Sequence, residues 1–152
     1  MLGAVAHVGI TVPDMEKAIA FYQGVLGLTV IGDFSIEGEE ISDLVQEPGT
    51  KVRSVFLRNE DDRQSAPVEL LHFSESAEQG GQPYAGVTHN GITEIAFWVK
   101  DIEKTYEALR NQGVEFYSRP HTFTLDNYGT AKAVYCKDPF GTTLELMQMV
   151  KE

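Results

Sequence analysis

Apolar and polar residues alternate along this chain in patterns that predict short strands and two amphipathic helices. Strand-like runs, rich in β-branched and aromatic residues, are HVGIT, LTVIGDFSI, KVRSVFLRN, VELLHF, EIAFWV, VEFYSRPHTF, AKAVYC and TLELMQM. Apolar residues spaced i, i+4, i+7 predict one helix after the first strand and another after the fifth. They are Met15, Ile19 and Tyr22 in the first helix and Ile102, Tyr106 and Leu109 in the second. Asp14 and Asp101 are the expected N-caps.

The chain also contains an internal repeat. HVGITVPDMEKAIAFY, starting at His7, aligns without a gap over sixteen positions with EIAFWVKDIEKTYEAL, starting at Glu94. VELLHF aligns with LELMQM at a smaller shift, which places Glu69 on Glu145. The smaller shift leaves extra residues in the first half, within 36–66, where EEISDLVQ predicts a short helix. Each half is therefore a β-α-β-β-β module, at about 4–73 and about 91–150, joined by a linker at about 74–90.

Four polar residues interrupt these apolar strands at paired positions of the repeat. His7 corresponds to Glu94, and Glu69 corresponds to Glu145. A single Glu in a strand is usually a solvated edge residue, but a buried carboxylate needs a partner or a metal. Because repeated halves usually surround a pseudo-twofold axis, equivalent residues face each other across it. We therefore expect the four side chains to meet inside an apolar bowl.

Three carboxylates at close range do not all stay ionised without a cation between them. One imidazole nitrogen and three carboxylate oxygens suit a divalent ion such as Zn, Ni, Co, Mn, Fe(II) or Mg. The sequence thus predicts a metal site made of His7, Glu69, Glu94 and Glu145. The predicted fold class is α+β, with the two paired modules forming a curved mixed sheet around a central metal cavity.

Composition narrows the choice of partners. The 152 residues carry a net charge of −11, which disfavours nucleic acid and anionic membranes as partners. A small anion can still be bound locally, through Lys51, Arg53, Arg58 or Arg119. The single cysteine, Cys136, favours a reducing cytoplasm, and the apolar start of the chain is interpreted as a strand instead of a signal peptide. Unpaired module edges predict a homodimer.

These residues resemble those of a known family. His7 in HVGITVPD, Glu69 in VELLHF, Glu145 in DPFGTTLELMQ and the paired modules are similar to the vicinal oxygen chelate superfamily. That family includes glyoxalase (lactoylglutathione lyase), methylmalonyl-CoA epimerase, extradiol dioxygenases and the fosfomycin and bleomycin resistance proteins. Its metal ligands come from the first and last strands of each module, which implies His7, Glu69, Glu94 and Glu145 here. Glu94 departs from the family, because most of its metalloenzymes have a histidine at this position.

The resemblance implies a metal-dependent lyase, isomerase or epimerase that acts on a small molecule. Dioxygenases of the family use two histidines and one carboxylate, which one His and several Glu match poorly, so the glyoxalase-like and epimerase-like members fit better. In those enzymes the metal stabilises an enolate, and Glu145 and Glu69 would be both ligands and proton-transfer groups. The alternatives are an extradiol-type iron dioxygenase and a non-catalytic protein that binds a drug or another small molecule.

Overall fold

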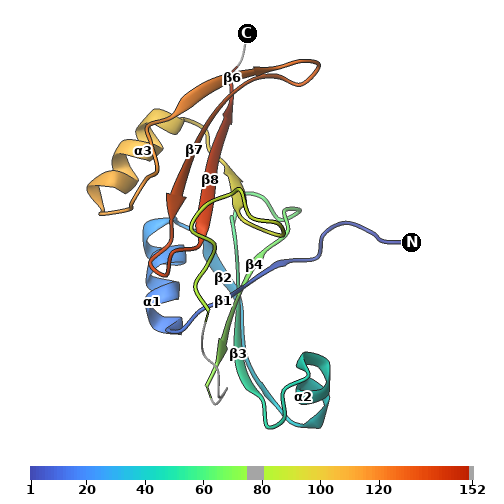
Figure 1. The fold of residues 1–152 in the computed structure, drawn as a ribbon. Helices are drawn as coiled ribbons and strands as arrows, with labels where there is room; N and C mark the ends of the chain where they lie inside the picture. Colours follow the sequence, from blue (N-terminus) through green and yellow to red (C-terminus); the bar gives the residue numbers. More distant parts are fainter. Residues whose placement is uncertain (75–80, 151–152) are drawn as a thin grey trace. The chain divides into compact units, whose positions relative to one another are not determined.

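The computed structural model describes residues 1–74 and 81–150. The chain divides into two compact units, Met1–Gly80 and Gly81–Glu152. Each unit contains one four-stranded sheet together with its helices (Figure 1). The α+β fold class predicted from the sequence is confirmed.

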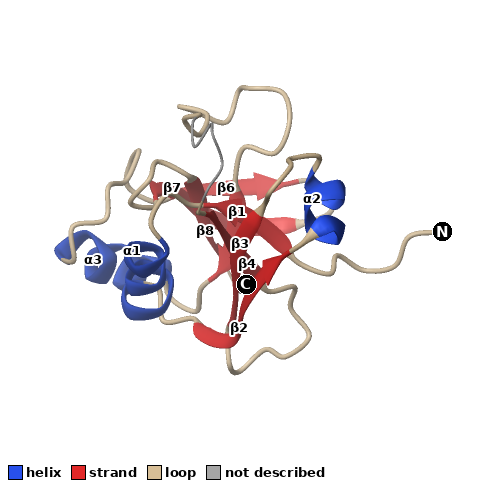
Figure 2. Cartoon of the chain, turned by 90° about the horizontal axis from the view of Figure 1, so that it is seen from below, coloured by secondary structure: helices blue, strands red, loops and turns tan. Residues whose placement is uncertain are grey.

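Unit one follows the predicted order of elements. These are β1 (Val8–Thr11), α1 (Met15–Ile19) continued by the π-helical segment η1 (Ala20–Val25), β2 (Thr29–Glu37), α2 (Glu39–Val45), β3 (Lys51–Arg58) and β4 (Val68–Phe73). The strand order in the sheet is β1-β4-β3-β2, with β1 parallel to β4 and the other neighbours antiparallel. Helix α2 lies apart from α1, beside the β2–β3 pair (Figure 2).

Unit two repeats this plan without a counterpart of α2. Its elements are β5 (Ile95–Trp98), α3 (Ile102–Asn111), β6 (His121–Leu125), β7 (Gly129–Lys137) and β8 (Thr143–Met149). The strand order is β5-β8-β7-β6, again with one parallel pair, β5 and β8. Gly9 pairs with Glu69 in unit one, and Ala96 pairs with Glu145 in unit two. The two units therefore agree in register with the repeat found in the sequence.

The predicted helix boundaries are confirmed by their caps. Asp14 Oδ1 accepts a hydrogen bond from Lys17 N at 3.0 Å, and Asp101 Oδ1 accepts one from Lys104 N at 3.1 Å. The first helix gives way to Gly27, whose φ is 78°, a left-handed conformation that glycine adopts without strain. The π-helical turns of η1 were not predicted, because a pattern with a period of 3.6 residues does not distinguish them from α-helix.

The sixth strand is shorter than its sequence suggests. The run VEFYSRPHTF was predicted to contain the sixth strand, and β6 begins at His121, directly after Pro120. Before it, Phe116 makes only an isolated bridge to Cys136. Proline has no N–H to give to a ladder and restricts the residue before it, so the strand starts beyond it. β6 lies at the edge of the sheet, where a proline at the start of a strand is tolerated.

One face of the unit-one sheet packs against α1 and forms the core. Tyr22, Leu57 and Leu70 have no exposed surface there, and burial of each such side chain stabilises the fold by about 1.5–3 kcal/mol. Because side chains alternate along a strand, Glu69 on β4 points away from this core. In unit two, Leu144 and Leu146 are buried while Glu145 between them is only half-buried. The repeat thus places a carboxylate on the face opposite the helix in both units.

Candidate functional site

His7 and Glu69 form a contact pair in unit one. His7 directly precedes β1, and its Nε2 lies 3.0 Å from Glu69 Oε2. The other oxygen of Glu69 accepts a hydrogen bond from the hydroxyl of Ser54 on β3, at 2.6 Å. The Ser54 residue is only 2% exposed and the Glu69 side chain 14% exposed, so Glu69 is held at both oxygens in a largely buried position.

Aromatic rings border this pair on the same face of the sheet. Phe56 on β3 pairs in register with Glu69, and its ring meets the His7 imidazole edge-on at 5.6 Å between centroids. Phe34 on β2 continues the apolar surface, 6.2 Å from the Phe56 ring. His7 therefore has a carboxylate on one side and a hydrocarbon surface on the other. A ligand bound here would present both a polar group and an apolar group to unit one.

Unit two has a pair of carboxylates at the equivalent positions. Glu94 directly precedes β5, and Glu145 lies on β8 opposite Tyr135 of β7. The Tyr135 hydroxyl is hydrogen-bonded to the Glu94 carboxylate. The second oxygen of Glu94, Oε2, is buried and has no hydrogen-bond partner among the described residues. A buried carboxylate oxygen without a partner is rare and requires a physical explanation.

The charges of this cluster affect one another. Burial raises the pKa of Glu145 above its ordinary value, and the nearby Glu94 charge raises it further. Burial also raises the pKa of Tyr135 to about 12, with added contributions from its hydrogen bond to Glu94 and from the Glu145 charge. Tyr135 therefore stays protonated at neutral pH and acts as a donor. Two carboxylates repel each other here, and a cation would relieve that repulsion.

Two features of the Glu94–Glu145 pair favour a bound cation. The oxygen of Glu94 that lacks a partner and the repulsion between Glu94 and Glu145 are both features that a bound cation would satisfy. Among the described residues, no group of three or more His, Cys, Asp or Glu side chains is placed to hold a metal. Each unit by itself holds two of the four predicted donors. One imidazole and three carboxylates suit hard or borderline divalent ions.

The remaining histidines lie away from these pairs. His72 points to the opposite face of β4, as expected, and its Nδ1 lies 3.1 Å from the carbonyl oxygen of Val12. His89 stacks on Tyr84 with ring centroids 4.7 Å apart, and His121 is exposed at the start of β6. Among the described residues, these histidines therefore have other partners or other surroundings than the His7–Glu69 pair.

Sequence reasoning missed the contacts that orient the predicted residues. Ser54, Phe56 and Tyr135 were not among the residues predicted for the site. Alternation along KVRSVFLRN and AKAVYCKD places these side chains on the face that carries Glu69 and Glu145. The alternation of residues in these strands therefore indicates the face of each side chain. The two strands share too few residues for the internal repeat to pair Phe56 with Tyr135.

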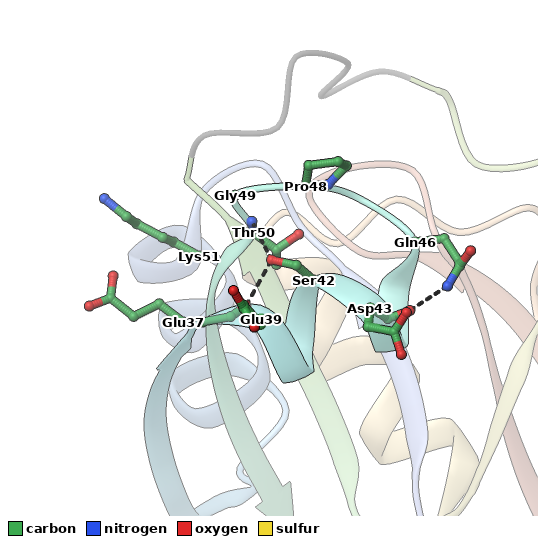
Figure 3. A pocket seen from close by; sticks show the side chains of 10 residues that line it. Glu37, Glu39, Ser42, Asp43, Gln46, Pro48, Gly49, Thr50 and Lys51 are labelled. Atoms are coloured by element: carbon green, nitrogen blue, oxygen red, sulfur yellow. Dashed lines mark hydrogen bonds between the residues drawn. The ribbon is translucent and has the colours of Figure 1, made fainter.

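A separate hollow opens beside α2 in unit one (Figure 3). Its lining residues are Glu37, Gly38, Glu39, Ser42, Asp43, Gln46, Pro48, Gly49, Thr50 and Lys51. Ser42 accepts a hydrogen bond from Thr50 N at 3.1 Å and donates one to the Gly38 carbonyl at 2.8 Å, so its hydroxyl closes the loop after α2. None of the four predicted metal ligands lines this hollow.

Comparison with known proteins gives the family. A sequence profile of the Glyoxalase/Bleomycin resistance protein/Dioxygenase superfamily matches residues 4–146. The chain belongs to this superfamily, which confirms the resemblance inferred from its motifs. Its relatives carry the names of lyases, epimerases and dioxygenases.

Two curated relatives and one solved structure illustrate how similar the chain is to known members of the superfamily. The chain is 25% identical over 142 residues to a probable lactoylglutathione lyase of Synechocystis sp., covering 93% of this chain and 92% of that protein. It is 30% identical over 117 residues to an ethylmalonyl-CoA/methylmalonyl-CoA epimerase of Cereibacter sphaeroides, covering 74% and 73%. The crystal structure of a glyoxalase family protein from Bacillus cereus matches with a TM-score of 0.82 at 20% identity, over 99% and 97% of the two chains.

In the part of the chain that the structure describes, none of the helices has the length and apolar character needed to cross a bilayer.

Proposed function

We propose that this protein is a metal-dependent isomerase, epimerase or lyase that moves a proton at a carbon next to a substrate carbonyl. The observation that carries the proposal is the Glu94–Tyr135–Glu145 cluster, in which a buried carboxylate oxygen has no partner beside a second carboxylate of raised pKa. Relatives named as a lyase and as epimerases support the reaction class. A protein that only binds an apolar molecule has no need for two partly buried carboxylates in its site, because burying them is unfavourable.

The proposed ligands are His7 and Glu69 of unit one and Glu94 and Glu145 of unit two. The proposal is the same whether the His7–Glu69 pair and the Glu94–Glu145 pair come from one chain or from two copies of the chain. The ion would act as a Lewis acid toward a carbonyl oxygen of the substrate. Ser54 and Tyr135 would orient the Glu69 and Glu94 carboxylates, because each is hydrogen-bonded to one of them.

Glu145 and Glu69 are the proposed proton-transfer pair. A general base works best when its pKa approaches the working pH, and burial together with Glu94 moves the pKa of Glu145 in that direction. A carboxylate oxygen of Glu145 would take the proton from the substrate carbon. Either Glu145 would return that proton, or Glu69, after taking up a proton from solvent, would deliver one at the same or the adjacent carbon. His7 and Glu94 would remain ligands throughout.

Two measurements test this function. Elemental analysis of the purified protein should find a divalent ion, and Glu94→Ala should lose most of it. With the ion bound, Glu145→Gln should keep metal yet lose hydrogen–deuterium exchange at the substrate carbon, followed by NMR with methylmalonyl-CoA and with the methylglyoxal–glutathione adduct. Unchanged exchange in Glu145→Gln would show that this residue is not the base.

Two further measurements test the alternative functions. Oxygen consumption with catechols would favour the dioxygenase, and binding of apolar ligands by metal-free protein would favour a non-catalytic binding protein.

We also propose a homodimer, with small molecules as the partners of the site and neither nucleic acid nor membrane. The edge strands of both sheets support the dimer, because unpaired edges favour association. Light scattering coupled to gel filtration measures this directly. A monomer at micromolar concentration would contradict the proposal.

A further inference from the structure

Arg58 lies on the same face of unit one as the His7–Glu69 pair. Side chains alternate along β3, so Ser54, Phe56 and Arg58 share a face. Phe56 pairs in register with Glu69 and contacts the His7 ring. Arg58 is two residues farther along the strand, which corresponds to about 7 Å. Arg58 therefore lies on the same face as the pair, next to Phe56, and its guanidinium reaches the loop after β3, where it contacts Arg63.

The Arg58 guanidinium has spare hydrogen-bonding capacity. Its Nη1 donates to the carbonyl oxygen of Arg63 at 2.9 Å. Its Nε is buried and has no hydrogen-bond partner among the described residues. No described acidic side chain lies within ion-pair distance of it, although the chain carries a net charge of −11. A partly buried cation without a counter-ion among the described residues favours a bound anion. Because Nε is covered by protein atoms, the anion would approach through the Nη atoms.

The second unit provides an internal comparison. Lys137 follows Tyr135 by two residues, as Arg58 follows Phe56, so the two cations hold equivalent positions. Lys137 Nζ is paired with Glu115 Oε1 at 2.8 Å. Arg53, on the other face of β3, is paired with both Asp33 and Glu16. These two cations therefore have carboxylate partners, whereas Arg58 has none among the described residues.

We propose that Arg58 binds a carboxylate of the substrate, so that the substrates are anions with a carboxylate beyond the reacting carbonyl. The assignment of a substrate rests on the proposed function, but anion binding at Arg58 does not. Arginine suits this role because its planar fork matches a carboxylate with two parallel hydrogen bonds. Phe56 precedes Arg58 by two residues on this face and contacts the His7 ring, so it would contact the apolar chain that joins the carboxylate to the reacting end.

The first test uses metal-free protein and glutarate as the probe. The Nε–H signal of Arg58 is followed by NMR in 15N-labelled protein and assigned by its loss in Arg58→Gln. Glutarate should shift this signal saturably, while sodium chloride at matched ionic strength should not. Arg63→Gln, which keeps the carbonyl that Arg58 contacts, should give the same response as wild type. Absence of a saturable shift would overturn the proposal whatever the outcome for the metal.

The second test uses calorimetry on protein loaded with the ion found by elemental analysis. The probes are 2-oxoglutarate and 5-methyl-2-oxohexanoate, which share a chelating head and differ in the distal carboxylate. Wild type should bind 2-oxoglutarate at least about tenfold more tightly. Arg58→Gln should lose the preference, Arg58→Lys should keep part of it, and Lys137→Gln should keep all of it.

The outcomes separate the two proposals. Equal affinities in wild type, or a preference that survives in Arg58→Gln, would overturn the role of Arg58 and leave the metal chemistry in place. If neither oxoacid binds the loaded protein while glutarate still shifts the Arg58 signal, the proposed function fails and the anion site stands.

Discussion

Phe56 and Tyr135 occupy equivalent positions in the two units: Phe56 pairs with Glu69, and Tyr135 pairs with Glu145. Phe56 packs against an imidazole, whereas the Tyr135 hydroxyl bonds to a carboxylate. Where unit two has Glu94 in place of histidine, it also has a phenol in place of a phenyl ring. The Tyr135 hydroxyl is hydrogen-bonded to Glu94, yet Glu94 Oε2 is buried without a partner among the described residues. The two differences between the units are therefore chemically linked.

Tyr135→Phe is expected to weaken metal binding by about tenfold or more. Hydrogen bonds from neighbouring groups orient metal ligands, and losing one typically reduces affinity ten- to a hundredfold. The variant makes unit two like unit one at this position, but leaves Glu94 without its donor. Competition with a chromophoric chelator measures the dissociation constant.

Tyr117→Phe is the matched control for this variant. The Tyr117 ring meets that of Tyr135 edge-on at 6.2 Å, but its hydroxyl lies 2.9 Å from Thr143 Oγ1. Tyr117→Phe should therefore leave the metal affinity unchanged. Equal affinity in Tyr135→Phe and wild type would show that Glu94 needs no donor.

Ser54→Ala should lower both stability and metal affinity. The buried hydroxyl donates to Glu69 at 2.6 Å, and removing a donor to a charged group destabilises a protein by about 1.5–3 kcal/mol. Urea unfolding measures the stability, and the chelator competition measures the affinity. Ser65→Ala removes a hydroxyl that bonds only to the exposed Asp62 carbonyl and is the control. A stable variant with normal affinity would mean that Glu69 is fixed by His7 alone.

Much of this fold could be predicted because each part has a local cause. Asp14 and Asp101 each follow a strand and cap the next helix through a hydrogen bond to a backbone N–H three residues later. This contact depends only on neighbouring residues, so the sequence alone indicates it. The repeat then gave the equivalence of Gly9 and Ala96 without knowledge of the pairing. The predictions that hold are those that depend on neighbours in sequence or on the duplication.

The contacts within the site depend on residues distant in sequence, so they were not predicted. Ser54 meets Glu69 across two strands, and Tyr135 meets Glu94, which lies at the start of another strand. Both contacts depend on which strands are neighbours and on their register, and no local pattern encodes these. The four-ligand site remains a prediction for the same reason, because its two pairs lie in different units.

Glu94→Gln should change stability in opposite directions with and without metal. In metal-free protein it removes a partly buried charge beside Glu145, while the amide oxygen can still accept from Tyr135, so unfolding should require about 1 kcal/mol more. A bound ion stabilises wild type according to its saturation, by about 2.7 kcal/mol at a hundredfold excess over the dissociation constant. The variant should lose most of this gain. Thermal unfolding with and without the ion measures both effects.

The exposed Glu60 provides the control for the loss of one negative charge. Glu60→Gln should change neither the metal-free stability nor the gain from metal. A Glu94→Gln variant that is less stable in both conditions would indicate that the carboxylate has a structural role and is not a ligand.

The stability of unit one should depend on pH through Asp33. Its hydrogen bond to Arg53, at 2.8 Å to Nη2, lowers the pKa of Asp33 below the ordinary value. A lowered pKa stabilises the fold above the unfolded value, about 3.9, and the contribution is lost as the pH falls through the folded value. Because the Asp33 side chain is 44% exposed, solvent screening limits the effect to about 1 kcal/mol. Asp33→Asn should therefore be less stable than wild type at pH 7 and approach it in acid, as measured by urea unfolding at a series of pH values.

Asp126→Asn is the control, because it removes an exposed carboxylate and should match wild type at every pH. A constant difference between Asp33→Asn and wild type at all pH values would show that the ion pair contributes nothing.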